Sequence, residues 1–418
     1  MLKHHDDAPF IVLDISRLIS RATAAAATGI DRVELAYARY LLDHARHRTG
    51  FCAMHPLGIL RLLPLQATEN FVDLIEARWN GDTRVSAQGA ARRLQRLLLW
   101  WPNRVGMLRQ RAHGRRIAYL LTSHHHLMRK DTIARALRRW NAVFITMIHD
   151  LIPLEYPEYS RPREPERHRR RIETVAALAD GVIVPSDVVG DALRITLKSK
   201  TTRAIPVWTI RHGVPAYARS PAPPESEMNE EDVYFVCLGT IEPRKNHLLL
   251  LNLWREMVQA EGRQVPRLIL IGKRGWENEN VIDMLERCPA LRGKVQEMNG
   301  LPDRETVDIL RGARALLFPS FSEGFGLPLA EALMLGVPAI CADIPVLREV
   351  GGHIPEYLDP LDGPGWRCAI EDFCNRGERY VRQGKAVVTA RFWGWTESVE
   401  ASISQLDKVI PEVETYLA

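Results

Sequence analysis

The sequence predicts an α/β protein with two doubly wound domains, each built around a mainly parallel β-sheet. Short apolar segments typical of buried strands alternate with helical segments, and this alternation occurs twice along 418 residues. A chain of this length usually forms two or more domains, and 46% hydrophobic residues are enough for two globular cores. Residues 219–226, rich in Pro and Ser, separate the two alternations and predict a linker.

The first alternation predicts an N-terminal domain over residues 1–218. A short strand at residues 11–14 opens it, followed by a loop and a helix from about Asp31 to Ala45. Later apolar runs predict further strands at residues 117–121, 142–148 and 181–185, with helical segments between them. Because strands and helices alternate, we expect a parallel sheet.

The second alternation predicts a C-terminal domain over residues 228–388. Its expected strands are residues 233–238, 267–271, 295–298, 315–319 and 338–341, each separated from the next by a helical segment. Residues 389–418 have helical periodicity after Trp395 and predict a C-terminal helix.

The charge of the chain is unevenly distributed. The net charge is +5, but residues 1–220 contain 35 Lys and Arg against 20 Asp and Glu. A basic half is consistent with nucleic acid, an anionic membrane surface or a phosphate-bearing substrate. No recognised nucleic-acid module is present, so we expect no nucleic-acid partner and favour a membrane or a pyrophosphate group.

The cysteines and apolar segments bear on cellular location. The six cysteines have no Cys-x-x-Cys spacing, which is typical of reduced structural thiols. No run of about 18 apolar residues predicts a membrane-spanning helix, and the N-terminus does not resemble a secretory signal. We therefore expect a cytoplasmic protein.

Residues 315–337 are the most informative stretch of the sequence. A predicted buried strand leads through a Gly-rich turn into a helix that begins near Leu327. Backbone N–H groups at a helix start attract anions, and glycines allow a phosphate to approach the backbone closely. Glu323 and Glu331 bracket this turn and could bind hydroxyl groups, which predicts a nucleotide-sugar ligand. The alternative is that both are solvated surface carboxylates.

Four motifs together resemble the retaining glycosyltransferases of family 4. Residues 322–337 resemble the Glu-x7-Glu signature, and residues 239–246 resemble the diphosphate loop. Residues 147–153 resemble the His-containing strand end of the N-terminal domain, and residues 211–214 resemble the segment before the interdomain linker. This resemblance implies the GT-B fold, in which two Rossmann-like domains face each other across a cleft. It also implies that the C-terminal helix crosses back to the N-terminal domain, although packing on its own domain remains an alternative.

The resemblance assigns donor binding to the C-terminal domain. It implies that Glu331 binds the donor ribose and that Glu323 lies beside the transferred sugar. Arg244 and Lys245 would stabilise the negative charge that develops on the leaving diphosphate, so that no metal or other cofactor is expected. Many relatives carry Arg where this chain has Thr240, which makes Arg244 the candidate for that role. Further donor-binding residues are expected in the two loops: Gly239, Thr240, Gly324, Phe325, Gly326 and Leu327.

The resemblance assigns a donor-sugar contact and acceptor binding to the N-terminal domain. His149, which ends a predicted strand, would hydrogen-bond a donor-sugar hydroxyl; the alternative is a core histidine without a ligand. Gly29 and Arg32 resemble an acceptor-side loop, for which the alternative is an ordinary helix start. His125, within the triplet at residues 124–126, is expected to line the acceptor cleft. Consecutive histidines rarely point at one ion, so a metal site is not expected there.

Residues 92–111 combine arginines and leucines with two tryptophans and contain no acidic residue. Arg, Trp and Leu in one helix are typical of segments that lie among anionic lipid headgroups. The alternative is an amphipathic helix that covers the N-terminal sheet and places the tryptophans in the core.

The family resemblance implies a metal-independent, retaining bacterial glycosyltransferase. The basic N-terminal half and the Arg/Trp segment favour a place on the inner face of the plasma membrane. The motif variants most resemble mannosyltransferases of O-antigen and exopolysaccharide assembly, which favours GDP-mannose as donor. The expected acceptor is a polyprenyl-diphosphate-linked oligosaccharide of a surface polysaccharide such as lipopolysaccharide. A UDP-sugar donor and a non-catalytic nucleotide-sugar binder remain the alternatives.

Overall fold

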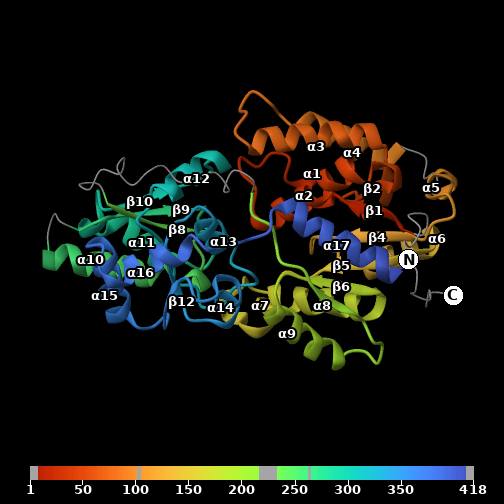
Figure 1. Ribbon diagram of the computed structural model, residues 1–418. Coiled ribbons are helices and arrows are strands. Elements are labelled where there is room, and N and C mark those ends of the chain that lie inside the picture. The colour runs from red at the N-terminus through yellow and green to blue at the C-terminus, as the bar shows by residue number, and fades with distance from the viewer. Residues whose placement is uncertain (1–7, 101–104, 216–232, 262–264, 411–418) are drawn as a thin grey trace. The chain divides into compact units, whose positions relative to one another are not determined.

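The computed structural model describes residues 8–100, 105–215, 233–261 and 265–410, which form two compact units (Figure 1). Unit 1 contains the chain up to Leu154, residues Arg163–Gly213 and the chain from Trp395. Unit 2 contains Glu155–Pro162 and Val214–Gly394. The linker predicted at residues 219–226 lies outside the described residues.

Unit 1 is built on a seven-stranded sheet with the strand order β3-β2-β1-β4-β5-β6-β7. Neighbouring strands are parallel, apart from the antiparallel pair β2 and β3. The strands are β1 Phe10–Asp14, β2 Thr49–Met54, β3 Leu60–Leu63, β4 Ile117–Leu121, β5 Ala142–Met147, β6 Gly181–Val184 and β7 Val207–Thr209.

Helices cover both faces of this sheet. In β1, Ile11 and Leu13 belong to one apolar core, whereas Phe10 and Val12 belong to the other. The first core includes side chains from α2, α3, α4 and α17, and the second includes side chains from α5, α6, α8 and α9. The helices are α1 Ser16–Ser20, α2 Gly29–His44, α3 Leu65–Trp79, α4 Gln88–Trp100, α5 Val105–Ala112, α6 Lys130–Trp140, α7 Ile152–Glu155, α8 Glu164–Leu178, α9 Asp187–Lys198 and α17 Trp395–Val409.

The C-terminal helix α17 packs on unit 1. Val399, Ile403 and Leu406 are buried in the core that also contains α2. The hydroxyls of Tyr37 and Ser402 lie 2.5 Å apart, and Arg48 pairs with Asp407 at 2.7 Å. The last helix of the chain is therefore part of the domain that the first strand begins.

Unit 2 is built on a six-stranded parallel sheet with the order β10-β9-β8-β11-β12-β13. The strands are β8 Tyr234–Leu238, β9 Arg267–Ile271, β10 Val295–Met298, β11 Ala315–Phe318, β12 Ala339–Ala342 and β13 Glu356–Leu358. Its helices are α10 His247–Glu261, α11 Glu279–Arg287, α12 Asp303–Arg311, α13 Leu327–Met334, α14 Pro345–Gly351, α15 Gly363–Cys374 and α16 Glu378–Val387. The predicted α/β class with two parallel-sheet, doubly wound domains is confirmed.

Each sheet reverses its strand order at one point. In unit 1 the chain passes from β1 outward to β2 and β3, then returns to β4 on the other side of β1. In unit 2 the same reversal occurs between β8 and β11. Loops that leave the carboxyl ends of such strands diverge, and open α/β sheets bind ligands in the crevice between them.

Helix α4 contains the first part of the Arg/Trp segment. Its leucines Leu94 and Leu98 are buried in the unit 1 core, while Arg92, Arg93 and Arg96 lie outside that core. Trp100 is 84% exposed, so the alternative that placed both tryptophans in the core is wrong for this residue. Trp101 lies outside the described residues. Among the helices described, none is long and apolar enough to cross a membrane.

Candidate active site

The unit 2 site lies where β8 and β11 end side by side. The loop after β8 contains residues 239–246, and the loop after β11 contains residues 319–326 and leads into α13. Both loops leave the carboxyl ends of parallel strands at the switch point of the sheet, so their side chains converge there. The structure thus brings the predicted Arg244 and Lys245 together with Glu323.

Four charged side chains form one network in this site. Lys245 Nζ donates to Glu323 Oε1 at 2.5 Å, and Arg244 Nη1 lies 2.9 Å from Glu323 Oε2. Arg244 Nε also pairs with Glu242 at 2.6 Å. Arg244 Nη1 donates to the Ser322 carbonyl oxygen, and the Phe321 N–H donates to the Arg244 carbonyl oxygen. The two loops are therefore joined through both side chains and backbone.

Burial and charge act in opposite directions on this network. Burial alone would raise the pKa of Glu323, but the charges of Arg244 and Lys245 outweigh it and hold the pKa at about 2. Burial lowers the pKa of Lys245, and the charge of Glu323 compensates only partly. The Nζ of Lys245 also lies 4.7 Å from the centre of the Phe318 ring. The site therefore holds an ionised carboxylate between two cations.

Glycines make room for this arrangement. Gly239 has φ of +149°, and a Cβ atom there would lie 3.3 Å from Cε of Lys245. A Cβ atom at Gly272, after β9, would lie 1.9 Å from the Gly239 carbonyl oxygen. Side chains at either position would displace the loop that carries Lys245.

The Gly-rich turn starts α13 as predicted. Gly326 precedes the helix with φ of +90°, and a Cβ atom there would lie 2.7 Å from Cδ2 of Leu347. Phe325 is buried, and Gly324 and Leu327 are half-buried. Glu331 of α13 is 5% exposed and the Glu323 side chain is 6% exposed. Neither glutamate is the solvated surface carboxylate of the alternative interpretation.

Two features of unit 2 have no counterpart in the sequence predictions. His247, at the start of α10, is buried, and neither ring nitrogen has a hydrogen-bond partner among the described residues. Burial, and to a smaller extent the charge of Lys245, lower the pKa of His247 to about 3. Tyr159 stacks on Phe321 with ring centres 5.6 Å apart, and its carbonyl oxygen accepts from Trp276 Nε1. The only sequence signal for His247 is its position two residues after Lys245.

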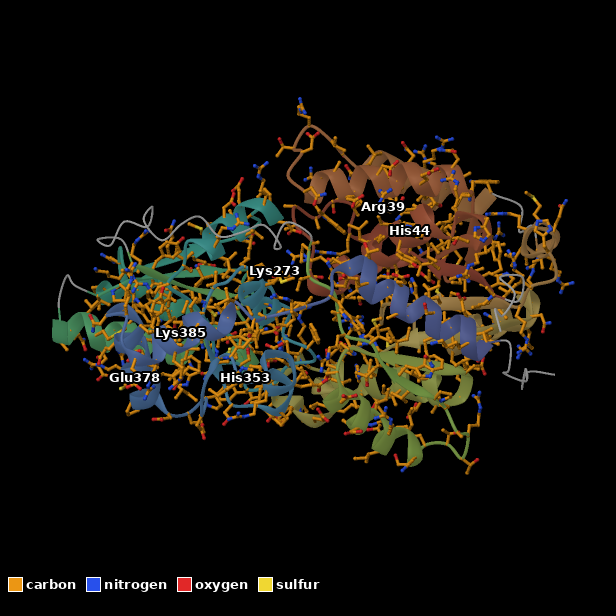
Figure 2. All side chains as sticks on the ribbon, viewed as in Figure 1. Arg39, His44, Lys273, His353, Glu378 and Lys385 are labelled. Atoms are coloured by element: carbon orange, nitrogen blue, oxygen red, sulfur yellow. The ribbon has the colours of Figure 1, made fainter. Side chains whose placement is uncertain are left out.

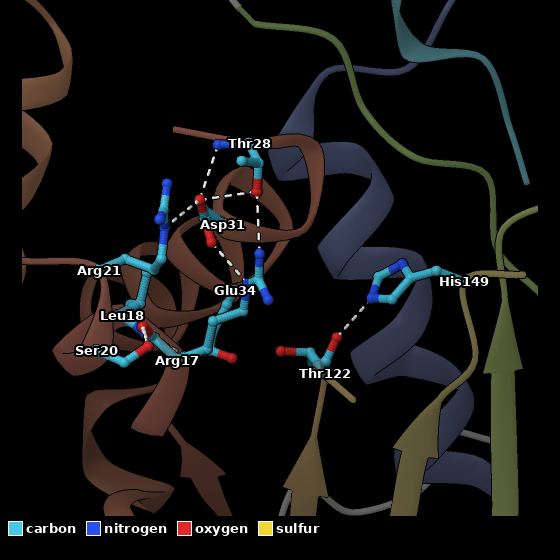
Figure 3. Close-up of polar contacts among 9 residues, drawn as sticks. All are labelled: Arg17, Leu18, Ser20, Arg21, Thr28, Asp31, Glu34, Thr122 and His149. Carbon is cyan, nitrogen blue, oxygen red and sulfur yellow. Dashed lines mark hydrogen bonds and ion pairs between the residues drawn. The ribbon is translucent and has the colours of Figure 1, made fainter. Parts of the chain in front are cut away.

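His149 lies at the carboxyl edge of the unit 1 sheet, after β5. Its Nε2 donates to the Thr122 carbonyl oxygen at 2.8 Å, which leaves Nδ1 as the acceptor nitrogen (Figure 3). Its backbone N–H donates to His124 Nε2. Burial lowers the pKa of His149 to about 4, outweighing the hydrogen bond to Thr122 and the charge of Asp150. The imidazole is therefore neutral at pH 7.

The three consecutive histidines have different surroundings. His125 is exposed and its ring packs against His126, whereas His124 packs against His149 and His168. Within the described ranges, no group of three His, Cys, Asp or Glu residues is arranged to hold a metal ion.

The predicted acceptor loop leads into α2. Gly29 is the first residue of the helix, and Arg32 is half-buried in its first turn. Asp31 is fully buried and accepts hydrogen bonds from the Thr28 N–H and hydroxyl, both at 2.8 Å. Two arginines from the segment after β1 also bind Asp31: Arg17 at 2.6 Å and Arg21 at 3.2 Å (Figure 3). Sequence reasoning missed both arginines.

One family of known proteins matches part of the chain. Residues 219–354 match the family model described as glycosyl transferases group 1, and this range includes Arg244, Lys245, Glu323 and Glu331. Over these residues the chain is similar to group 1 glycosyl transferases. The network of charged residues described above lies within this matched range.

Several curated relatives match part of the chain. The chain is 26% identical over 287 residues to the serotype-specific mannosyltransferase WbdA of Escherichia coli, which covers 66% of this chain. It is 31% identical over 172 residues to the O-antigen chain mannosyltransferase B of Escherichia coli, which covers 41% of this chain. The aligned residues span only 35% and 45% of those two relatives, respectively.

Solved structures match over nearly the whole chain. Anabaena Alr3699/HepE in complex with UDP and glucose has a TM-score of 0.62 at 14% identity, covering 97% of this chain and 100% of that one. Sucrose-phosphate synthase from Thermosynechococcus elongatus has a TM-score of 0.61 at 17% identity, covering 95% of this chain and 97% of that one. With its two Rossmann-like units, the protein has the GT-B fold.

Proposed function

We propose that this protein is a retaining glycosyltransferase that moves mannose from GDP-mannose to a polyprenyl-diphosphate-linked oligosaccharide. The observation that carries the proposal is the ion network of Arg244, Lys245 and Glu323 at the switch point of unit 2. Two cations and a carboxylate held ionised are the groups needed to release a diphosphate from a sugar.

The cations act on the leaving group. When the bond between the anomeric carbon and the diphosphate oxygen breaks, negative charge increases on the diphosphate. Arg244 and Lys245 are already held in place by Glu323 and Glu242, so they stabilise that charge without reorganisation. The proposed reaction therefore requires no metal ion.

The carboxylates act on the sugars of the donor. Glu323 lies between the two cations, where it would bind a hydroxyl of the transferred sugar and stabilise positive charge at the anomeric carbon. Glu331, buried in α13, would bind the ribose hydroxyls. The backbone of residues 324–327 would contact the diphosphate.

The transfer is proposed to occur on one face of the sugar. The acceptor oxygen forms a bond to the anomeric carbon while the bond to the diphosphate oxygen breaks, and the acceptor proton passes to a leaving phosphate oxygen. This preference follows from the family 4 resemblance. Neutral His149, whose Nδ1 is a hydrogen-bond acceptor, would bind a hydroxyl of the donor sugar.

The choice of mannose is supported by the names of relatives. Five of them are named as mannosyltransferases, and two of these names include the O-antigen chain. The proposed acceptor is therefore a lipid-linked oligosaccharide of a bacterial surface polysaccharide. The arginines of α4, with exposed Trp100, are consistent with peripheral binding to the inner face of the plasma membrane.

The donor can be tested by thermal unfolding with GDP, UDP and ADP, followed by transfer assays with the matching nucleotide sugars. We expect GDP to raise the unfolding midpoint most and GDP-mannose to be the productive donor. NMR of the product should show the anomeric configuration of the donor. Stabilisation by UDP alone would contradict the choice of donor, and an inverted product would contradict the retaining mechanism.

A further inference from the structure

The Asp31 carboxylate accepts a hydrogen bond from the Nε–H group of each of two arginines. Arg17 and Arg21 both use Nε, at 2.6 Å and 3.2 Å. Arg17 Nη2 additionally donates to the Thr28 hydroxyl at 3.1 Å. Among the described residues, Nη1 of Arg17 and both terminal nitrogens of Arg21 have no hydrogen-bond partner. Nη1 of Arg17 and both terminal amino groups of Arg21 are thus available to a second anion.

The charges around Asp31 do not balance. Asp31 is fully buried, and one carboxylate faces two guanidinium groups whose side chains are 21% and 31% exposed. Glu34 does not compete for Arg17 as an anion, because burial and then Asp14 raise its pKa to about 8. Asp14 accepts hydrogen bonds from the Ser16 N–H and the Tyr119 hydroxyl and pairs with neither arginine. Arg17 and Arg21 therefore share one carboxylate, that of Asp31, and both side chains remain partly open to solvent.

Arg17 and Arg21 lie at the edge of the unit 1 sheet where open α/β sheets bind ligands. Arg17 and Arg21 lie in the segment after β1, and residues 122–126 follow β4, so the two segments flank the switch point of unit 1. Arg17 is also near enough to His124 and His149 for its charge to lower their pKa values, although burial lowers them more. Figure 3 shows Arg17 on the side of Asp31 toward Thr122 and His149.

We propose that Arg17 and Arg21, held by Asp31, bind the phosphate or diphosphate group of the acceptor substrate. A planar guanidinium presents two parallel N–H donors, which match two oxygens of a phosphate. Asp31 positions the arginines and also fixes Thr28 at the start of α2, so the binding loop is ordered before the ligand arrives. The inference rests on the proposed function, because that function supplies a diphosphate-linked acceptor.

The direct test measures binding of geranyl diphosphate by calorimetry, with saturating GDP present to occupy the unit 2 site. The variants are Arg21→Gln, which removes the charge, and Arg21→Lys, which keeps it without the planar donor pair. Arg84→Gln is the matched control, since Arg84 belongs to unit 1, is 89% exposed and pairs with neighbouring Asp82. Geraniol serves as the phosphate-free probe.

We expect Arg21→Gln to weaken geranyl diphosphate binding by about tenfold or more, as loss of a hydrogen-bonded charge pair predicts. Arg21→Lys should lose less, and Arg84→Gln should match the wild type. None of the variants should change GDP affinity. Unchanged geranyl diphosphate affinity in Arg21→Gln, or wild-type affinity no higher than for geraniol, would overturn the proposal.

A lipid headgroup is the competing anion for this arginine pair. Co-sedimentation with phosphatidylglycerol vesicles tests it, and we expect Arg21→Gln to bind these vesicles as the wild type does. A loss of vesicle binding equal to the loss of geranyl diphosphate binding would overturn the acceptor assignment.

Transfer assays separate the anion site from the proposed function. Wild-type protein that binds geranyl diphosphate through Arg21 but transfers no sugar would refute the proposed function and leave the anion site standing. Active wild-type enzyme in which Arg21→Gln has no effect on geranyl diphosphate binding would refute the anion site alone.

Discussion

Lys245 and Glu323 are 78 residues apart in the sequence, yet Lys245 Nζ donates to Glu323 Oε1 at 2.5 Å. Both side chains are at most 8% exposed, and Arg244 lies on the other carboxylate oxygen. Removing one partner of a buried ion pair destabilises a protein strongly, because the remaining charge is uncompensated. The intact pair itself contributes little to stability, because burying both charges costs solvation free energy. The arrangement is therefore better explained by ligand chemistry than by stabilisation of the fold.

Replacing Glu323 by Gln should reduce kcat by about 100-fold or more, because the carboxylate that stabilises charge at the anomeric carbon is lost. The change also leaves buried Lys245 and half-buried Arg244 without their shared anion, so the free energy of unfolding should fall by about 3 kcal/mol. Steady-state kinetics and denaturant unfolding measure the two effects. Near-normal kcat in a folded Glu323→Gln protein would refute the proposed site.

Replacing Lys245 by Ala should weaken GDP binding and reduce turnover by about 100-fold or more, because one of the two cations beside the diphosphate is removed. The matched control is Lys385→Ala, at an exposed position of α16 in the same unit (Figure 2). Calorimetry with GDP and transfer assays measure both variants. Equal losses in the two variants would show that the effect of Lys245 is not specific to the site.

Most central strands could be predicted from the sequence because parallel strands buried on both faces are continuous apolar runs. β4 and β11 are fully buried examples. β2 is the exception in unit 1: it is buried throughout but begins with Thr49 and Gly50, and no strand is predicted there. The edge strands β3, β7 and β13 are short and partly exposed, so their sequences lack this signal. The strand order, and hence the switch points, also depends on contacts that apolar periodicity does not encode.

The candidate site was predictable only where its residues lie together in a motif. Arg244 and Lys245 are adjacent in one loop, and Glu323 and Glu331 are eight residues apart. Arg17 and Arg21 instead depend on Asp31, which is 14 and 10 residues away and belongs to another element. A pairing of this kind forms only through folding, and no local sequence pattern indicates it.

Replacing Gly239 by Ala should reduce activity by displacing Lys245. The added Cβ atom would lie 3.3 Å from Cε of Lys245, and φ of +149° is unfavourable for a residue with a side chain. We expect turnover in transfer assays to fall by about tenfold or more, since a displacement of about 1 Å can cost 100-fold.

Gly384→Ala is the control for this glycine. It lies in α16, and a Cβ atom there would have no heavy atom within 4 Å. It should retain full turnover and gain about 0.5–1 kcal/mol of stability from the higher helix propensity of alanine. If Gly239→Ala retained wild-type turnover, the packing of Gly239 against Lys245 would not matter for the reaction.

Glu34 should make stability depend on pH between about 4.5 and 8. Burial is the larger cause and the negative charge of Asp14 the smaller one; together they raise the folded-state pKa of Glu34 to about 8, from an unfolded value near 4.5. Its protonated form therefore stabilises the folded state fully below pH 4.5, and this contribution is lost as the pH rises through 8.

Glu34→Gln has the shape of the protonated acid and does not titrate. Relative to wild type, its free energy of unfolding should rise by about 1.4 kcal/mol per pH unit between pH 5 and 7.5. Denaturant unfolding of both proteins across this range measures the difference, and parallel stability curves would show that Glu34 is ionised in the folded protein.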